Sequence, residues 1–100
     1  MKWLRELKQV KILGKMYDIK YVLPAEPLTD EGKVGRCDWA KGIIHIMAGL
    51  KDDVFLDVLL HEILHGINQE MDCRLEEEHI NRVASGLQAV IMDNFKLLPR

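Results

Sequence analysis

Two histidines and a glutamate stand close together in the segment LLHEILHGI, residues 59–67. His61 and His65 are four positions apart, and Glu62 directly follows the first histidine. On a helix, four positions correspond to about 400° of rotation, so both imidazoles would lie on one face, one turn apart. Two imidazoles at this spacing can bind one tetrahedral zinc ion, with Zn–N distances of about 2.0–2.1 Å. The segment therefore predicts a zinc site.

Glu62 has a different predicted role from the two histidines. It lies one position, or about 100°, further round the helix, where it can hydrogen-bond a water on the metal without ligating the metal. The H-E-x-x-H pattern thus supplies two ligands and one general base, as zinc peptidases require. The alternative is a core helix that carries two histidines by chance. The apolar neighbours argue against it, because a buried polar group without a partner costs roughly 1–3 kcal/mol.

A catalytic zinc site needs three protein ligands and an open position for water, so a third ligand must be sought elsewhere. The metzincin continuation of the motif fails, because Asn68 and Met71 occupy the positions of its glycine and its third histidine. The next segment of the chain offers five candidates, which are Cys73, Glu76, Glu77, Glu78 and His79.

Helix periodicity favours Glu77 among these candidates. Glu77 lies three positions before Ile80 and Glu76 lies four before it, so both glutamates would share the inward face of the second helix. Asn81 follows Glu77 by one turn, and its amide oxygen could accept a hydrogen bond from a zinc-bound histidine. We therefore expect Glu77 as the third ligand, supported by Asn81, with Glu76 as the remaining alternative.

The elements around these residues predict an α+β domain. Residues 10–23 and 34–47 each read as two strands joined by a turn. An apolar period of three to four positions then predicts helices over about 54–71 and about 75–97. The order hairpin, hairpin, helix, helix predicts one domain over residues 1–100, with a three- or four-stranded sheet packed on two long antiparallel helices.

Composition argues against several classes of function. The 100 residues carry a formal net charge of −2 and no basic stripe, so we expect no binding to nucleic acid. No apolar stretch approaches the roughly 20 residues that span a bilayer. Charges interrupt the N-terminal segment, so it does not resemble a secretory signal. Cys37 and Cys73 lack C-x-x-C spacing, and we expect free thiols in a cytoplasmic protein.

HEILH at residues 61–65 and EEHINRVA at residues 77–84 together resemble the gluzincin zinc peptidases. They are especially similar to the minigluzincins and to small phage-type and ImmA/IrrE-type metallopeptidases. In these families the third ligand opens a helix as E-x-x-A-N/D-x-F-A, and the resemblance therefore implies Glu77 as ligand. The larger gluzincins carry E-x-x-x-D, in which the aspartate supports the first zinc histidine. Asn81 stands at that position here.

The resemblance also implies a substrate-binding strand. Small members of these families share a strand–turn–strand start and an edge strand before the zinc helix, which residues 43–47 would supply. A peptide or unfolded protein would bind along this strand through main-chain hydrogen bonds. The chain departs from the family pattern at Ile80, Asn81 and Val83. It also has no clear counterpart of the histidine or tyrosine that stabilises the oxyanion, for which the candidates are Tyr17, Tyr21 and His79.

Two functions agree with these observations. The first is a zinc metalloendopeptidase in which Glu62 is the general base, with low activity because a small domain has no room for a deep cleft. The second is a non-catalytic module, stabilised by zinc, that binds a partner protein through its exposed edge strand. A fourth protein ligand such as Cys73 or His79 would favour the second. The oligomeric state stays open.

Overall fold

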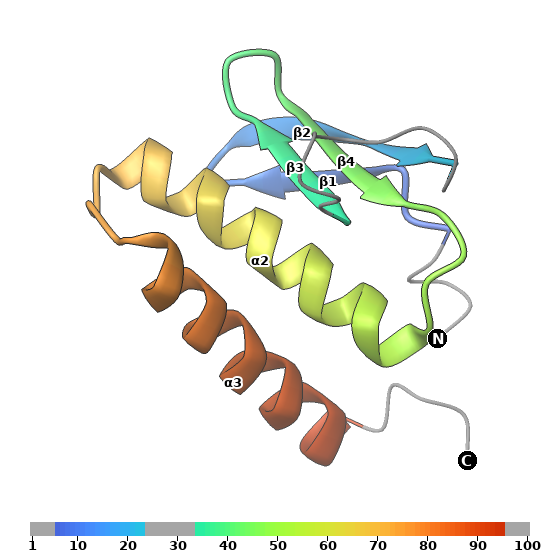
Figure 1. Cartoon of the computed structure of the whole chain (residues 1–100). Helices are drawn as coiled ribbons and strands as arrows, with labels where there is room; N and C mark the ends of the chain where they lie inside the picture. The colour runs from blue at the N-terminus through green and yellow to red at the C-terminus, as the bar shows by residue number, and fades with distance from the viewer. Residues whose placement is uncertain (1–5, 24–33, 96–100) are drawn as a thin grey trace.

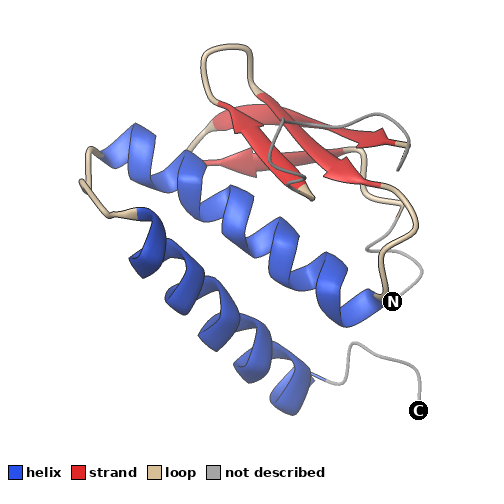
Figure 2. Ribbon diagram, in the orientation of Figure 1, coloured by secondary structure: helices blue, strands red, loops and turns tan. Residues whose placement is uncertain are grey.

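The computed structural model describes residues 6–23 and 34–95. Four strands precede two helices: β1 (Gln9–Ile12), β2 (Lys15–Val22), β3 (Gly35–Asp38), β4 (Ile43–Met47), α2 (Asp52–Met71) and α3 (Glu77–Phe95). Figures 1 and 2 show the sheet on one side of α2 and α3 on the other, with the two helices antiparallel. The predicted α+β class is confirmed, with four strands in one sheet.

The first hairpin forms as the sequence predicts. β1 and β2 pair antiparallel, with Ile12 opposite Lys15. Leu13 and Gly14 connect them with φ angles of 50° and 85°, and positive φ at both central residues is typical of a two-residue hairpin turn. Alternation along β2 then buries Tyr17, which is 0% exposed and lies in the core under the sheet.

The second hairpin joins β3 to β4 through the predicted turn at residues 38–42. The Asp38 carboxylate accepts a hydrogen bond from the backbone N–H of Lys41 at 3.2 Å. The N–H of Gly42 donates to the carbonyl of Trp39 at 3.2 Å, and Gly42 has a φ of 67° that suits glycine. The turn therefore closes on side-chain and backbone hydrogen bonds that its sequence supplies.

The expectation that residues 43–47 form an exposed edge strand is wrong. The strand order is β1-β2-β4-β3, so β4 pairs with β2 in parallel and with β3 in antiparallel orientation. Ile44 and Ile46 are both 0% exposed. A run of β-branched residues at successive positions is typical of a central strand, which explains the placement. The strand at the end of the sheet, after β4, is β3.

Helix α2 covers one face of this sheet. Its buried apolar side chains join isoleucines and a tyrosine of the strands in one core, whose members are Ile12, Tyr17, Ile19, Ile44, Ile46, Phe55, Leu56, Val58 and Leu59. Gly66 allows α2 to pack closely on β1, since an added Cβ would lie 3.0 Å from Cδ1 of Ile12. Neither described helix has the length and apolarity that crossing a membrane would require.

Helix α3 packs on α2, on the side away from the sheet (Figure 1). Ile80 and Ala84 face α2 and are 1% and 0% exposed. The apolar period that predicts this helix also includes Ile91, which is partly buried, and Val83, Leu87 and Val90, which are exposed. The helix begins at Glu77, two residues later than expected, and the predicted end near residue 97 lies outside the described residues.

Candidate metal centre

The carboxylate of Glu77 reaches both histidines of the H-E-x-x-H motif. Oε1 of Glu77 lies 2.8 Å from Nε2 of His61, and Oε2 lies 2.9 Å from Nε2 of His65. The two Nε2 atoms are 3.1 Å apart. Three potential ligand atoms from two helices therefore converge on one point between α2 and α3.

These distances fit a shared metal ion. Tetrahedral ligands about 2.0–2.1 Å from zinc are about 3.3–3.4 Å from one another. The potential ligand atoms of the three side chains lie within 4.8 Å of one another, so small side-chain movements would bring these atoms to the spacing of zinc ligands. Two imidazole nitrogens and one carboxylate oxygen form a donor set that zinc binds at catalytic sites. Within the described residues, no fourth histidine, cysteine or carboxylate belongs to this group.

The three side chains differ in how the fold holds them. The side chains of His61 and His65 are 19% and 33% exposed, because α2 lies between the sheet and α3. The Glu77 side chain is 56% exposed at the start of α3. The fold therefore fixes the two histidines more firmly than it fixes the glutamate.

Asn68 connects the end of α2 to the start of α3. Its Oδ1 accepts a hydrogen bond from the backbone N–H of Leu75 at 2.9 Å, and its Nδ2 donates to the Leu75 carbonyl at 3.2 Å. Asn68 follows His65 by three positions, and Leu75 precedes Glu77 by two. This clamp therefore sets the path of the chain between two of the three candidate ligands. The sequence signal for it was an asparagine near a helix end, where such side chains often bond the backbone.

Glu62 is buried beside the candidate ligands, where it is 5% exposed. Strand β3 passes directly against it at Gly35. A Cβ added to Gly35 would lie 2.9 Å from Oε2 of Glu62 and 2.6 Å from Cγ1 of Val58. Real Cβ atoms do not approach other atoms this closely, so only glycine lets the strand and the carboxylate share this space.

A hollow of about 200 Å³ opens over the site. It is lined by three residues of β3 and by four from the helices, which are Gly35, Arg36, Cys37, His61, Glu62, His65 and Glu77. Burial, and to a lesser degree the charges of Glu62 and Asp38, raise the pKa of the Cys37 thiol to about 11. Cys37 thus lines the site as a neutral thiol and does not join the group of potential ligands.

Strand β3 presents backbone groups along this hollow. The N–H of Met47 donates to the carbonyl of Val34 at 2.9 Å, which fixes the hydrogen-bonding register of β3 and β4. Antiparallel pairs alternate between bonded and non-bonded partners, so Arg36 bonds β4. The N–H and C=O groups of Gly35 and Cys37 point away from β4, towards the outer edge of the sheet.

Glu70 of α2 anchors the turn that follows β3. Nε1 of Trp39 donates to Oε1 of Glu70 at 2.8 Å, and Nζ of Lys15 donates to the Trp39 carbonyl at 2.5 Å. The Lys15 ammonium also lies 4.6 Å from the centre of the Trp39 ring, a cation–π arrangement. These contacts join segments that are far apart in the sequence, and the sequence did not predict them. They hold the turn after β3 against α2, the helix that carries both motif histidines.

The other residues named from the sequence lie elsewhere. Asn81 is exposed and does not line the hollow over the site. Glu76, Glu78 and His79 form a separate, fully exposed group of possible ligands. Cys73 is exposed, and both cysteines are free thiols. The structure therefore brings Glu77 to the histidines and does not bring Asn81 or Cys73 there.

The two tyrosines considered for oxyanion stabilisation are engaged elsewhere. The Tyr17 hydroxyl donates to Oε1 of Glu70 at 3.4 Å, and burial is the main reason that its pKa is raised to about 12. The Tyr21 hydroxyl donates to the backbone carbonyl of Leu7 at 2.7 Å. Neither tyrosine lines the hollow over the site.

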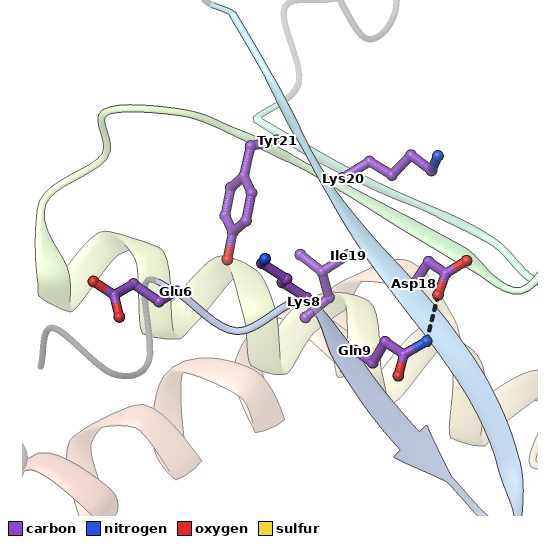
Figure 3. Close-up of a pocket in the computed structure, with 7 residues that line it drawn as sticks. All are labelled: Glu6, Lys8, Gln9, Asp18, Ile19, Lys20 and Tyr21. Carbon is purple, nitrogen blue, oxygen red and sulfur yellow. Dashed lines mark hydrogen bonds between the residues drawn. The ribbon is translucent and has the colours of Figure 1, made fainter.

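A wider hollow of about 670 Å³ lies on β1 and β2, and its lining is unlike that of the site. Figure 3 shows Tyr21, Lys20 and Gln9 around it, with Nε2 of Gln9 donating to Oδ1 of Asp18 at 2.9 Å. The described residues that line it include no group of side chains that could hold a metal ion. Reactive side chains converge instead at the smaller hollow beside β3.

No protein-family model, no curated protein and no solved structure matches this chain. Inference about function therefore depends on the geometry and chemistry of the site.

Proposed function

We propose that this protein is a zinc metalloendopeptidase. One observation carries the proposal: the Glu77 carboxylate from α3 lies within 2.9 Å of the Nε2 atoms of both motif histidines. Glu62, at the general-base position of the motif, is buried at the same hollow. Three ligands and an adjacent carboxylate form the constellation that hydrolysis at a zinc site needs.

The roles of the residues follow from their positions. His61, His65 and Glu77 would hold the metal, and zinc supplies a Lewis acid that activates water for attack on a peptide carbonyl. Glu62 would accept a proton from that water and pass it to the leaving amine. Gly35 keeps the Glu62 carboxylate in place, because the backbone of β3 closes the space on one side of it.

The peptide substrate would lie along β3. The outward N–H and C=O groups of Gly35 and Cys37 offer main-chain hydrogen bonds to an extended peptide, as in other cases of strand addition. The hollow of about 200 Å³ is small, so side-chain recognition would be limited. We therefore propose flexible peptides or unfolded protein as substrates, with low activity, in the cytoplasm, where the free thiols of this chain would stay reduced.

The number of ligands supports an enzyme over a zinc-stabilised interaction module. Structural zinc sites usually have four protein ligands, whereas catalytic sites leave one position open. Within the described residues the group at the site has three members, and it includes neither Cys73 nor His79. The interaction module was expected to bind its partner through an exposed edge strand at residues 43–47. These residues form β4, which lies between β2 and β3 in the sheet.

Proteolysis with and without the general base tests the proposal. Zinc-loaded protein and its Glu62→Gln variant are incubated with an unstructured polypeptide, and fragments are identified by mass spectrometry. We expect cleavage by the wild type only, abolished by chelation, with equal zinc content in both proteins. Identical fragments from both proteins, or none from either across neutral pH, would refute the proposed activity.

A pair of substitutions at Cys37 tests the substrate strand. Cys37→Pro removes the N–H that points to the outer edge of the sheet, whereas Cys37→Ala removes the thiol and keeps that N–H. Edge strands tolerate proline, so both variants should fold. We expect Cys37→Pro to lose most cleavage and Cys37→Ala to keep it, and equal rates for the two variants would exclude this strand as the binding edge.

A further inference from the structure

One side of α3, beside its contact with α2, carries a stripe of exposed apolar side chains. Val83, Leu87 and Val90 are 44%, 40% and 53% exposed. They recur at four and three positions and therefore share one side of the helix. Ile80 and Ala84 are buried against α2, and Leu87 lies about 20° from Ile80 on the helix. The stripe therefore borders the face that holds α3 in the fold, with Val83 and Val90 further round the helix.

Gly86 lies beside this stripe, in the middle of α3. A Cβ added there would meet no other atom within 4 Å. Glycine destabilises an exposed helix interior relative to alanine, and packing against the residues that the structure describes gives no reason for it here. A small residue does allow a second helix backbone to approach closely from outside. The glycine thus points to a crossing helix at this position.

Charged residues are placed around Gly86 in a pattern that complements itself. His79 lies seven positions before Gly86, Arg82 lies four before it, and Asp93 lies seven after it. All three fall within about 40° of Gly86 on the helix surface. A two-fold axis at Gly86 would place Asp93 of a second copy opposite His79 and one turn from Arg82. Each copy would meet opposite charges at both ends of the contact.

We propose that two copies of this chain associate through α3, with the helices antiparallel and crossing at Gly86. Val90 and Val83 lie about 40° and 60° from Gly86 on the helix, so Val90 of each copy then packs near Val83 of the other, with Leu87 at the edge of the contact. Val83 lies about 120° round the helix from Glu77, so the contact leaves the metal centre accessible. The interface does not depend on zinc or on proteolysis.

Sedimentation of the full chain from micromolar to millimolar concentration tests the association. We expect a monomer–dimer equilibrium, and we expect Val90→Glu to raise the dissociation constant at least about tenfold, as hot-spot substitutions do. Circular dichroism and zinc content of the variant should match those of the wild type, which separates this result from any failure of the metal centre. A monomer throughout the range, or undiminished association of Val90→Glu, would overturn the proposal.

A charge exchange tests the antiparallel register without altering the apolar stripe. Arg82→Asp and Asp93→Arg should each weaken association, and the double variant should restore it. Gly86→Leu should weaken association while raising the thermal stability of the monomer, because leucine favours helix and glycine does not. A double variant no better than the single ones would overturn the register. Wild-type association of Gly86→Leu would overturn the crossing at Gly86.

Discussion

The two helices that meet at the candidate metal centre are held in different ways. Helix α2 packs on the sheet with one side and on α3 with another, and it carries His61, Glu62 and His65. Helix α3 packs on α2 and begins at Glu77, whose side chain is 56% exposed. The fold thus organises one half of the centre before metal binds, and the other half depends more on the metal itself.

This difference indicates how such a small domain can keep a precise site. The proposed general base and two of the proposed ligands are held by the core, where Glu62 is 5% exposed and lies against the backbone of Gly35. The third ligand is held by its connection through Asn68 and by the ion that it would bind. Zinc would therefore stabilise α3 against α2 in addition to its role in chemistry.

The strongest test of the asymmetry removes the ligand on the exposed helix. Glu77→Ala should lower zinc affinity by more than the roughly 10–100-fold typical of residues that only support a ligand. Glu76→Ala and Glu78→Ala are matched controls, since both side chains belong to the separate exposed group. Competition with a chelator measures all three affinities. Equal losses in the three variants would contradict the assignment of Glu77.

Removal of the metal should affect the two helices unequally. Zinc at 100 times its dissociation constant stabilises the bound state by roughly 2.7 kcal/mol, and chelation removes that contribution. Hydrogen exchange should then become faster in residues 77–84 of α3 and change little in residues 55–66 of α2. The comparison would fail if both segments lost protection to the same extent.

A substitution on the sheet side should separate the base from the ligands. Gly35→Ala adds a Cβ that would lie 2.9 Å from Glu62 Oε2, so the carboxylate or the strand must move. Overpacking of this kind lowers stability by about 1–3 kcal/mol. We expect a large loss of cleavage with zinc affinity nearly unchanged, as measured by activity and chelator competition on the same preparation. A larger loss of zinc than of cleavage would show that Gly35 serves the ligands.

The smallest effect is expected at the connection between the helices. Asn68→Ala removes both hydrogen bonds to Leu75 and should lower zinc affinity about tenfold, in the range of residues that position a ligand. Asn68→Asp keeps the oxygen that accepts from the Leu75 N–H and should lose less. If the two variants bound zinc as well as the wild type, the connection would have no part in placing Glu77.

Local patterns predicted most of the elements of this fold. Alternation in β2, turn residues around Gly14 and Gly42, and the apolar period of α2 act over short distances along the chain. The strand order could not be read in the same way, because pairing of β4 with β2 joins segments more than twenty residues apart. The β-branched residues at positions 43–47 did indicate a central strand. The edge strand was predicted instead from the resemblance to small gluzincins.

The candidate site also combines features that a local sequence pattern predicts with features that depend on long-range packing. His61, Glu62 and His65 are set by spacing on one helix, so their arrangement could be predicted from five residues. The approach of Glu77 follows from helix periodicity and is present in the structure. The proximity of Gly35 to Glu62, and the anchoring of Trp39 by Glu70, depend on tertiary packing between distant segments that no local pattern encodes.

Zinc stoichiometry tests the central claim most directly. Mass spectrometry under non-denaturing conditions would count the metal in the wild type, in His61→Ala, in His65→Ala and in Glu62→Gln. The proposal assigns the ion to two histidines and Glu77, and the water to Glu62. We therefore predict one zinc per chain in the wild type and in Glu62→Gln, and none in either histidine variant. A wild type without zinc after incubation with the metal, or full occupancy in His61→Ala and His65→Ala, would contradict the account.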